Sequence, residues 1–378
     1  MSSCWASLLG WPHPVGNDAV SGERQHMNTI QLLRDLSEAS GVSGYEDEVQ
    51  AIVRKALEPH ADTLRIDALG NLIALKKGKR ADGAPTRAIM LAAHADEIGL
   101  MVKELEEGFI RFARVGGVDV RTLLGQEVVV HGERPLPGIV GSRPPHITPP
   151  EQREKIVGFD ELFIDVGIPE ERLSKLVHVG DVVTMRRDFL ELASGRVSGK
   201  AFDDRAGVVA VVECMETLST MDHSWDVYAV STSQEEVGLR GAMVSAYGIV
   251  PDVAIAVDVG WGEQPGVDEA ESVKMDAGPA IVRGPNIHPL MYEKLVATAK
   301  EHEVPHQTEI IAGRSGTDAW AIQVTREGIP CGLLSIPLRY MHTSVEIVCI
   351  KDIDRTARLM ALFIAGLDEH FAQVMRLD

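Results

Sequence analysis

The 378-residue chain has few cysteines, a deficit of positive charge and no long apolar run. Its four cysteines lie far apart and form no CxxC pair, so neither a disulfide framework nor a thiolate metal site is expected. Reduced thiols and a cytoplasmic location are the simplest interpretation. No apolar stretch approaches the roughly 18–20 residues that span a bilayer, so we expect no membrane partner.

Lysine and arginine number 37 against 56 acidic residues, which gives a net charge of −19. A chain this acidic repels the phosphodiester backbone, and we therefore expect no nucleic acid as a partner. Hydrophobic residues make up 45% and charged residues 25% of the chain, a composition typical of a globular protein with a substantial core.

The first 26 residues differ from the sequence that follows. They lack the basic start and the long apolar segment of a secretory signal. Apolar residues at helical spacing begin only after Met27, at Ile30, Leu33 and Leu36. We therefore expect residues 1–26 to be a disordered extension, with Met27 as an alternative start of the protein.

The rest of the chain is typical of an α/β protein that is interrupted by an all-β insertion. In residues 27–96 and 191–378, apolar strands alternate with helices, which predicts a mainly parallel sheet flanked by helices. Residues 97–190 instead contain short strands separated by Gly and Pro turns, a pattern that predicts a small β-barrel.

Polar side chains follow several of the predicted strands at the point where each strand ends. In open α/β sheets, ligands bind outside the carboxyl ends of the strands, so these side chains are candidates for one common site. The candidates at strand ends and helix starts are His94, Asp96, Asp203, Asp204, Glu235, Glu236, Asp258 and His342.

Two imidazoles and several carboxylates without a thiolate are ligands suited to zinc, with cobalt or manganese as alternatives. The ligands outnumber the needs of one tetrahedral ion, which predicts two divalent metal ions. A metal pair activates water for attack, so the pattern favours a hydrolase.

Each candidate also has an ordinary alternative role. Asp203 or Asp204 could cap the following helix, and a histidine after a strand is commonly structural. Glu235 and Glu236 could form the first turn of a helix, where the macrodipole favours acids. Their coincidence at successive strand ends favours the metal site.

The ordered motifs AHADEIGLMV, VGGVDVRTLLGQEV, GKAFDDRAG, QEEVGLRGA, AVDVG, GTDAWAIQ and IPLRYMHTSVE run from near Met27 to the C-terminus. In this order they resemble the glutamyl/deblocking aminopeptidase family. These are the tetrahedral (TET) dinuclear-metal aminopeptidases, some of which have been called cellulase M or endoglucanase. The resemblance implies a zinc-peptidase-like α/β fold with an inserted β-barrel.

Position by position, the resemblance implies two metal sites. His94, Asp203 and Asp258 would hold one ion. Glu236 and His342 would hold the other ion together with Asp203, which would bridge the pair.

The resemblance also implies the catalytic roles. Glu235 would be the general base for a water activated by the two metals, and Asp96 would orient His94. A cis peptide bond is expected between Asp203 and Asp204. The implied enzyme is a metal-dependent aminopeptidase that removes N-terminal residues from peptides.

Assembly follows from the resemblance as well. The family's β insertion mediates dimers, which assemble into hollow tetrahedral dodecamers that admit unfolded peptides. Residues 97–190 would then carry the dimer contacts of a homo-oligomer.

Three rival interpretations stay open. A related dinuclear amidohydrolase or deacylase would use the same metal core. A non-catalytic scaffold would have no need of Glu235. A glucanase would need sugar-stacking aromatics, and aromatic residues make up only 5% of the chain. The motifs fix neither the preferred N-terminal residue nor the physiological metal.

Overall fold

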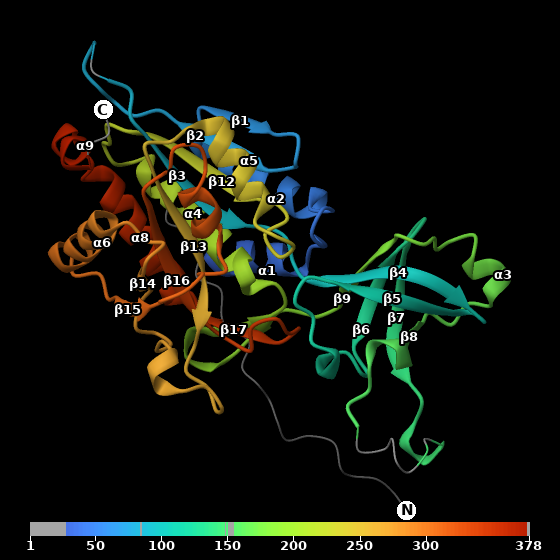
Figure 1. The fold of residues 1–378 in the computed structure, drawn as a ribbon. Coiled ribbons are helices and arrows are strands. Elements are labelled where there is room, and N and C mark those ends of the chain that lie inside the picture. Colours follow the sequence, from blue (N-terminus) through green and yellow to red (C-terminus); the bar gives the residue numbers. More distant parts are fainter. Residues whose placement is uncertain (1–27, 84, 148, 150–154, 376–378) are drawn as a thin grey trace, which may run out of the picture.

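A computed structural model describes residues 28–83, 85–147, 149 and 155–375. The extension predicted for residues 1–26 lies outside the described residues. Figure 1 shows two parts side by side: an α/β part, and a smaller β-barrel that projects from it.

The α/β part is built on one eleven-stranded sheet. Its centre, β12-β3-β13-β16, is parallel, the strands on either side of this centre pair antiparallel, and the side pair β14–β15 is parallel. This confirms the predicted α/β class with a largely parallel sheet. In sheet order the strands are β1 (Thr63–Ile66), β2 (Leu72–Lys76), β12 (Asp226–Thr232), β3 (Ala88–His94), β13 (Val253–Trp261), β16 (Cys331–Arg339), β17 (Glu346–Cys349), β11 (Arg196–Gly199) and β10 (Leu190–Glu191), with β14 (Ala280–Arg283) and β15 (Gln307–Ile310) attached to β16.

Two hydrophobic cores cover the two faces of this sheet. Successive side chains of a strand point to opposite faces, so Ile89 and Leu91 of β3 belong to one core and Met90 and Ala92 to the other. The first core is completed by α1 (Thr29–Glu38), α2 (Asp47–Leu57), α4 (Phe202–Leu218), α6 (Pro289–Glu301), α8 (Ile350–Ala365) and α9 (Glu369–Met375), and the second by α5 (Arg240–Ile249) and α7 (Asp318–Gln323).

The C-terminal region contains two helices within the described residues. Helix α8 ends at Ala365 with Gly366 as its C-cap, and α9 begins at Glu369. Glycine lowers helix stability and readily ends a helix, which accounts for the break.

The inserted part is a closed antiparallel barrel with a core of its own, as predicted. Apolar side chains such as Leu100, Ile110 and Val128 fill it and are fully buried. A short helix, α3 (Glu170–Leu173), follows the strand Leu162–Asp165 in the chain and precedes the strand Val182–Met185. The six strands pair in the order β4 (Gly99–Glu106), β5 (Phe109–Val115), β8 (Leu162–Asp165), β7 (Pro135–Ser142), β6 (Glu127–His131) and β9 (Val182–Met185).

A buried ion cluster lies where the chain passes between the two parts. Glu97, between β3 and β4, pairs with Lys200 Nζ at 2.7 Å and with Arg205 Nη2 at 3.2 Å. Burial lowers the pKa of Lys200 to about 8, which Glu97 opposes. The cluster ties the segment that enters the barrel to the segment that follows it.

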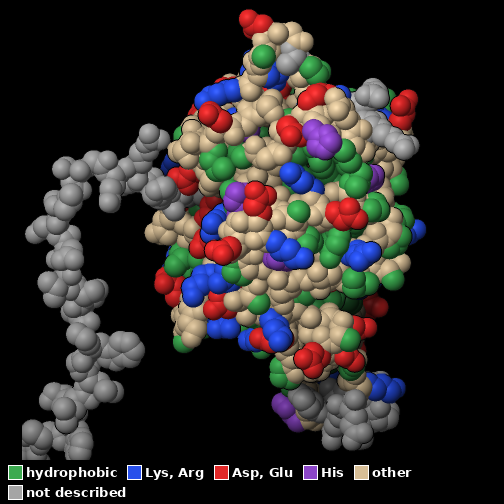
Figure 2. All heavy atoms as spheres, turned by 90° about the vertical axis from the view of Figure 1, so that its left-hand side faces the viewer, with side chains coloured by type: hydrophobic (Ala, Val, Ile, Leu, Met, Phe, Trp, Pro, Cys, Tyr) green, Lys and Arg blue, Asp and Glu red, His purple; other side chains and the backbone are tan. Residues whose placement is uncertain are grey.

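The surface carries charge of both signs. On the face drawn in Figure 2, acidic and basic side chains are intermingled rather than separated into fields. Among the residues that the structure describes, no helix combines the length and the apolar character needed to cross a membrane.

Candidate active site

The central strands deliver His94 and Asp258 to the same face of the sheet. His94 ends β3 and continues the series of Met90 and Ala92, while Asp258 on β13 continues the series of Ala254 and Ala256. These two strands are parallel neighbours, so their carboxyl ends meet at one edge. Both residues are buried: 2% of the His94 surface and 6% of the Asp258 surface is exposed.

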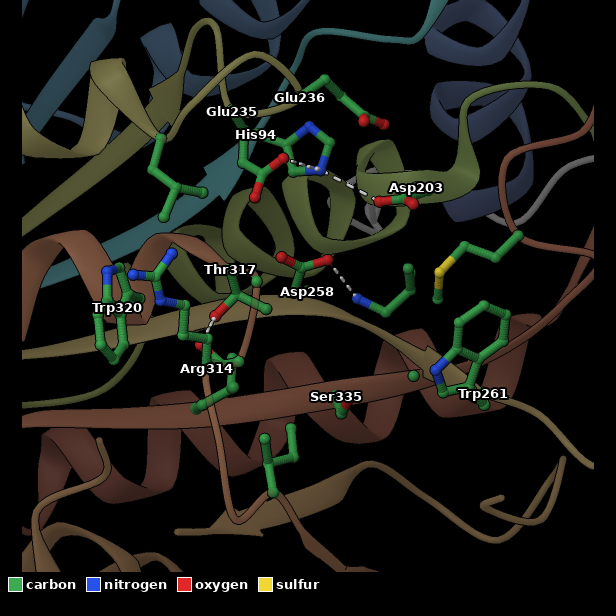
Figure 3. A pocket seen from close by; sticks show the side chains of 18 of the residues that line it. His94, Asp203, Glu235, Glu236, Asp258, Trp261, Arg314, Thr317, Trp320 and Ser335 are labelled. Atoms are coloured by element: carbon green, nitrogen blue, oxygen red, sulfur yellow. Dashed lines mark hydrogen bonds and ion pairs between the residues drawn. The ribbon is translucent and has the colours of Figure 1, made fainter. Parts of the chain in front are cut away.

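Asp203 lies between the two histidines at the start of α4. One of its carboxylate oxygens, Oδ1, is 3.1 Å from His94 Nε2, and Oδ2 is 3.3 Å from His342 Nε2. The Asp203–Asp204 peptide bond is cis, as the resemblance implied. Asp203 therefore presents one oxygen to each histidine. Figure 3 shows the interaction between His94 and Asp203 as a dashed line.

The loop after β12 supplies the glutamate pair. Glu236 Oε1 lies 3.4 Å from His342 Nε2, and Glu235 Oε2 lies 3.9 Å from His94 Nε2. The two adjacent carboxylates thus face different histidines. The structure brings together all the residues proposed as metal ligands, in two sets that share Asp203. The first set is His94, Asp203 and Asp258, and the second is Asp203, Glu236 and His342. Within each set the possible ligand atoms lie within 4.8 Å of one another.

These acids are buried without enough positive charge to balance them. Burial raises the pKa of Glu235 to about 11 and that of Glu236 to about 8, and it holds the pKa of Asp258 well above its ordinary value. Burial opposes charging of His94, but the hydrogen bonds with Asp203 and Asp96 outweigh it and raise its pKa. A carboxylate cluster of this kind is costly unless cations neutralise it.

The residues form two groups that could hold a divalent metal ion. Buried carboxylate oxygens of Glu235, Asp204 and Asp318 have no hydrogen-bond partner within the described part of the chain. The ligand atoms are imidazole nitrogens and carboxylate oxygens without thiolate, a donor set that suits zinc, cobalt or manganese.

Asp96 anchors the glutamate loop as well as the histidine. Its carboxylate accepts hydrogen bonds from the Ser43 hydroxyl at 2.6 Å and from the backbone N–H groups of Glu235 at 2.9 Å and Glu236 at 3.2 Å. His94 Nδ1 is 3.1 Å from the Asp96 backbone carbonyl and 3.5 Å from the Asp96 carboxylate. Asp96 therefore connects both halves of the site.

Glu346 is a supporting residue that the sequence did not single out. Its two carboxylate oxygens accept the backbone N–H groups of Asp203 at 3.2 Å and of His342 at 2.9 Å. Burial raises the pKa of Glu346 well above its ordinary value. Glu346 lies within the IPLRYMHTSVE motif, but the sequence does not show whether this glutamate on β17 is buried or exposed.

The barrel contributes one wall of the site. A Cβ atom added at Gly117 would lie 2.5 Å from Nδ1 of His342, and one added at Gly116 would lie 3.4 Å from Cβ of Glu236. Only glycines allow the backbone after β5 to approach both ligands this closely.

A pocket of about 560 Å³ opens beside the ligand sets. Figure 3 shows Asp258, Thr317, Ser335, Trp261, Arg314 and Trp320 around it. Its lining combines acids near the histidines with apolar side chains farther away, among them Met243, Val259, Ile311 and Leu333. Such a pocket has room for an amino-acid side chain next to the candidate metal centre.

Residues 70–359 match the family model described as M42 glutamyl aminopeptidase. The chain belongs to the M42 glutamyl aminopeptidase family. The match covers more than half of the chain and contains all the candidate ligands, so the resemblance inferred from the motifs is confirmed.

Individual relatives of the M42 family agree over most of their length. Lysyl aminopeptidase of Pyrococcus furiosus is 38% identical over 339 residues, which cover 87% of this chain and 94% of that protein. The TET aminopeptidase of the marine sediment archaeon Thaumarchaeota archaeon SCGC AB-539-E09 has a TM-score of 0.86 at 35% identity, covering 92% of this chain and 98% of that one.

A second similar structure is the TET1 peptidase of Pyrococcus horikoshii, which can assemble into a tetrahedron or a large octahedral shell. It has a TM-score of 0.79 at 30% identity and covers 90% of this chain and 100% of that one. Membership of the M42 family makes this chain a hydrolase that acts on peptides, a metal-dependent aminopeptidase.

Proposed function

We propose that the chain removes N-terminal residues from peptides with two divalent metal ions and Glu235 as the general base. The observation that carries the proposal is the pair of ligand sets that share Asp203 and lie beside Glu235. His94 and Asp258 would hold one ion, Glu236 and His342 the other. Bound metal ions would polarise the scissile carbonyl and ease the deprotonation of water.

Glu235 is the acid–base group of the proposed reaction. Its Oε1 is buried and has no hydrogen-bond partner among the described residues, so it is free to accept a proton from the attacking water. Burial raises the pKa of Glu235, and two bound cations would oppose this shift, so that the carboxylate could accept the proton and later pass it to the leaving peptide nitrogen. The hydrogen bond from its backbone N–H to Asp96 fixes the segment that carries it.

The acidic surroundings explain why the substrate would be bound by its free N-terminus. Five carboxylates line the pocket, one more than two divalent ions would neutralise, and this excess favours a positive group there: they belong to Asp203, Glu235, Glu236, Asp258 and Glu309. An α-ammonium group at this point places the first peptide bond next to Glu235.

The quaternary structure is also proposed by analogy. The Pyrococcus horikoshii relative forms closed shells, and we infer a homo-oligomer of dimers, assembled as a tetrahedral dodecamer, for this chain. In this scheme residues 97–190 carry the dimer contacts, and residues 27–96 with 191–378 form the catalytic unit. Cys214, Cys331 and Cys349 are buried and unpaired, which supports a cytoplasmic location.

A metal-restoration assay tests the proposed function. The full chain would be treated with a chelator, dialysed, and supplied with zinc, cobalt or manganese in separate samples. We expect release of p-nitroaniline from one or more aminoacyl-p-nitroanilides only after metal is restored, and no release from N-acetylated analogues. Release from N-acetylated substrates in preference to free amines would identify a deacylase instead.

A further inference from the structure

The active-site pocket contains a carboxylate that the proposed reaction does not use. Glu309 on β15 lines the same pocket as His94 and Asp258, and its Oε2 is buried without a hydrogen-bond partner in the described part of the chain. Burial raises the pKa of Glu309, and a hydrogen bond with Ser335 opposes this shift. A buried carboxylate with a free oxygen needs a partner from outside the chain.

The register of the sheet fixes where this carboxylate lies relative to the candidate metal centre. Asp258 on β13 is paired with Ser335 on β16. A Cβ atom added at Gly260 would lie 3.2 Å from Glu309 Oε2 and 2.5 Å from Ser335 Oγ. The Glu309 carboxylate is therefore packed against Gly260, where a larger side chain would displace it.

Gly260 and Asp258 are two residues apart on one strand, so they share a face of the sheet and are separated by about 7 Å. A substrate whose first peptide bond lies next to Glu235 and the ion that Asp258 would hold can direct its first side chain along this face toward Glu309. A lysine carries its ammonium group on a flexible four-carbon stem of comparable reach.

Apolar side chains also line the pocket. Among them are Ile311, Leu333, Trp261 and Met243. Methylene groups of a long basic side chain pack against such a surface while the charged end remains at a polar group.

One basic side chain also lines the pocket. Arg314 is exposed, and its guanidinium carbon stacks 5.2 Å from the centroid of the Trp320 ring. This cation already has an aromatic partner near the solvent, whereas the free oxygen of Glu309 is buried deeper. A substrate side chain that fills the pocket would therefore meet the Glu309 carboxylate, and a buried negative group of this kind requires a positive partner.

We infer that Glu309 is a specificity-determining residue that selects substrates with a basic N-terminal residue, lysine or arginine. The inference rests on the proposed aminopeptidase function. It does not follow from family membership, because the family model is described as glutamyl aminopeptidase and one relative as lysyl aminopeptidase.

Steady-state kinetics of the metal-restored full chain test the inference, with Lys-, Arg-, Leu- and Glu-p-nitroanilide as substrates. We expect kcat/KM for Lys to exceed that for Leu by at least about tenfold. Glu309→Gln should lower kcat/KM for Lys by about 10- to 100-fold and leave that for Leu within about threefold. The near-isosteric amide keeps the shape of the pocket.

Two control variants accompany Glu309→Gln. Glu301→Gln makes the same change at an exposed position of α6 and should leave all four substrates unaffected. Arg314→Gln should leave the ratio of Lys to Leu within about threefold, since the inference assigns the selection to the buried carboxylate.

A preference of the wild-type chain for Glu or Leu would overturn the inference. So would a ratio of Lys to Leu that Glu309→Gln does not change, even with full activity toward Leu. Failure to release any N-terminal residue with any of the three metals would overturn the proposed function and this inference with it.

Discussion

The Asp96 carboxylate accepts the backbone N–H of Glu235 at 2.9 Å, which joins the end of β3 to the loop after β12. The same carboxylate accepts the Glu236 N–H at 3.2 Å, so both glutamates depend on one acceptor. The ligand His94 and the proposed base are therefore positioned by a single side chain that itself belongs to neither ligand set.

Replacement of Asp96 by Asn should disturb both halves of the site. The amide nitrogen would replace one of the two acceptor oxygens, so that an N–H donor would face the backbone N–H of either Glu235 or Glu236. We expect kcat/KM, metal affinity or both to fall by about 10- to 100-fold, as for other residues that orient metal ligands. Aminopeptidase assays and metal titration measure the effect. Ser43→Ala, which removes only the hydroxyl donor to Asp96, should cost far less; equal losses in both variants would contradict the anchoring role.

The adjacent glutamates should respond differently to substitution. Glu235→Gln should retain its metals and lower kcat by about 10²–10⁴-fold, because the amide cannot accept the proton of the attacking water. Glu236→Ala should lose metal, because it removes the oxygen that lies 3.4 Å from His342 Nε2. Kinetics together with metal analysis of dialysed protein separate the two effects. Unchanged turnover in Glu235→Gln would refute its role as base.

Glu97 should be important for stability. Glu97→Gln leaves Lys200 buried with no carboxylate partner at 2.7 Å, and loss of one member of a buried pair typically costs about 3–5 kcal/mol. The shift in the denaturation midpoint at pH 7 measures this loss. Glu104→Gln, at an exposed position of β4, is the matched control. Equal midpoints for the two variants would show that the buried cluster does not stabilise the chain.

Stability should also depend on pH through Glu213. Burial raises its folded-state pKa from 4.5 to about 7, so the folded chain binds this proton more tightly than the unfolded chain does. The resulting stabilisation is fully present below pH 4.5 and is lost as the pH rises through 7. Glu213→Gln carries no charge and should be more stable than the wild type by about 1–2 kcal/mol at pH 8.

Paired denaturation curves at pH 5 and pH 8 test this prediction, because titration of the metal ligands is common to both proteins and cancels in the difference. The gain from Glu213→Gln should shrink toward zero at pH 5. A gain that is the same at both pH values would argue against titration of Glu213. The hydrogen bond from Thr29 Oγ1 to Glu213 can be accepted by the amide oxygen as well.

The central strands and the proposed ligands could be predicted from the sequence because each is marked locally. The apolar run that becomes β3 ends in His94, and the run that becomes β13 contains Asp258 close to its end. The barrel was predicted from its short strands and frequent turns. These features depend on neighbours in the chain, so pattern and composition reveal them.

Features that depend on distant contacts could not be predicted in this way. Glu346 supports Asp203, which lies 143 residues away in the sequence, and only the fold shows that its carboxylate faces inward. Glu309 resembles any acid on a short strand until its free oxygen is seen against Gly260. The antiparallel margins of the sheet likewise depend on which strands become neighbours, which their own sequences do not specify.

The close approach of Gly117 to His342 has a consequence for how the molecule could be rebuilt. The segment after β5 packs against His342 and Glu236, so the barrel is not an exchangeable attachment module. A chimaera that replaced it with another dimer-forming domain would leave the His342 imidazole without the surface against which it rests. Transplantation would therefore have to carry the glycine pair after β5 along with the ligands, and the two parts would have to evolve together.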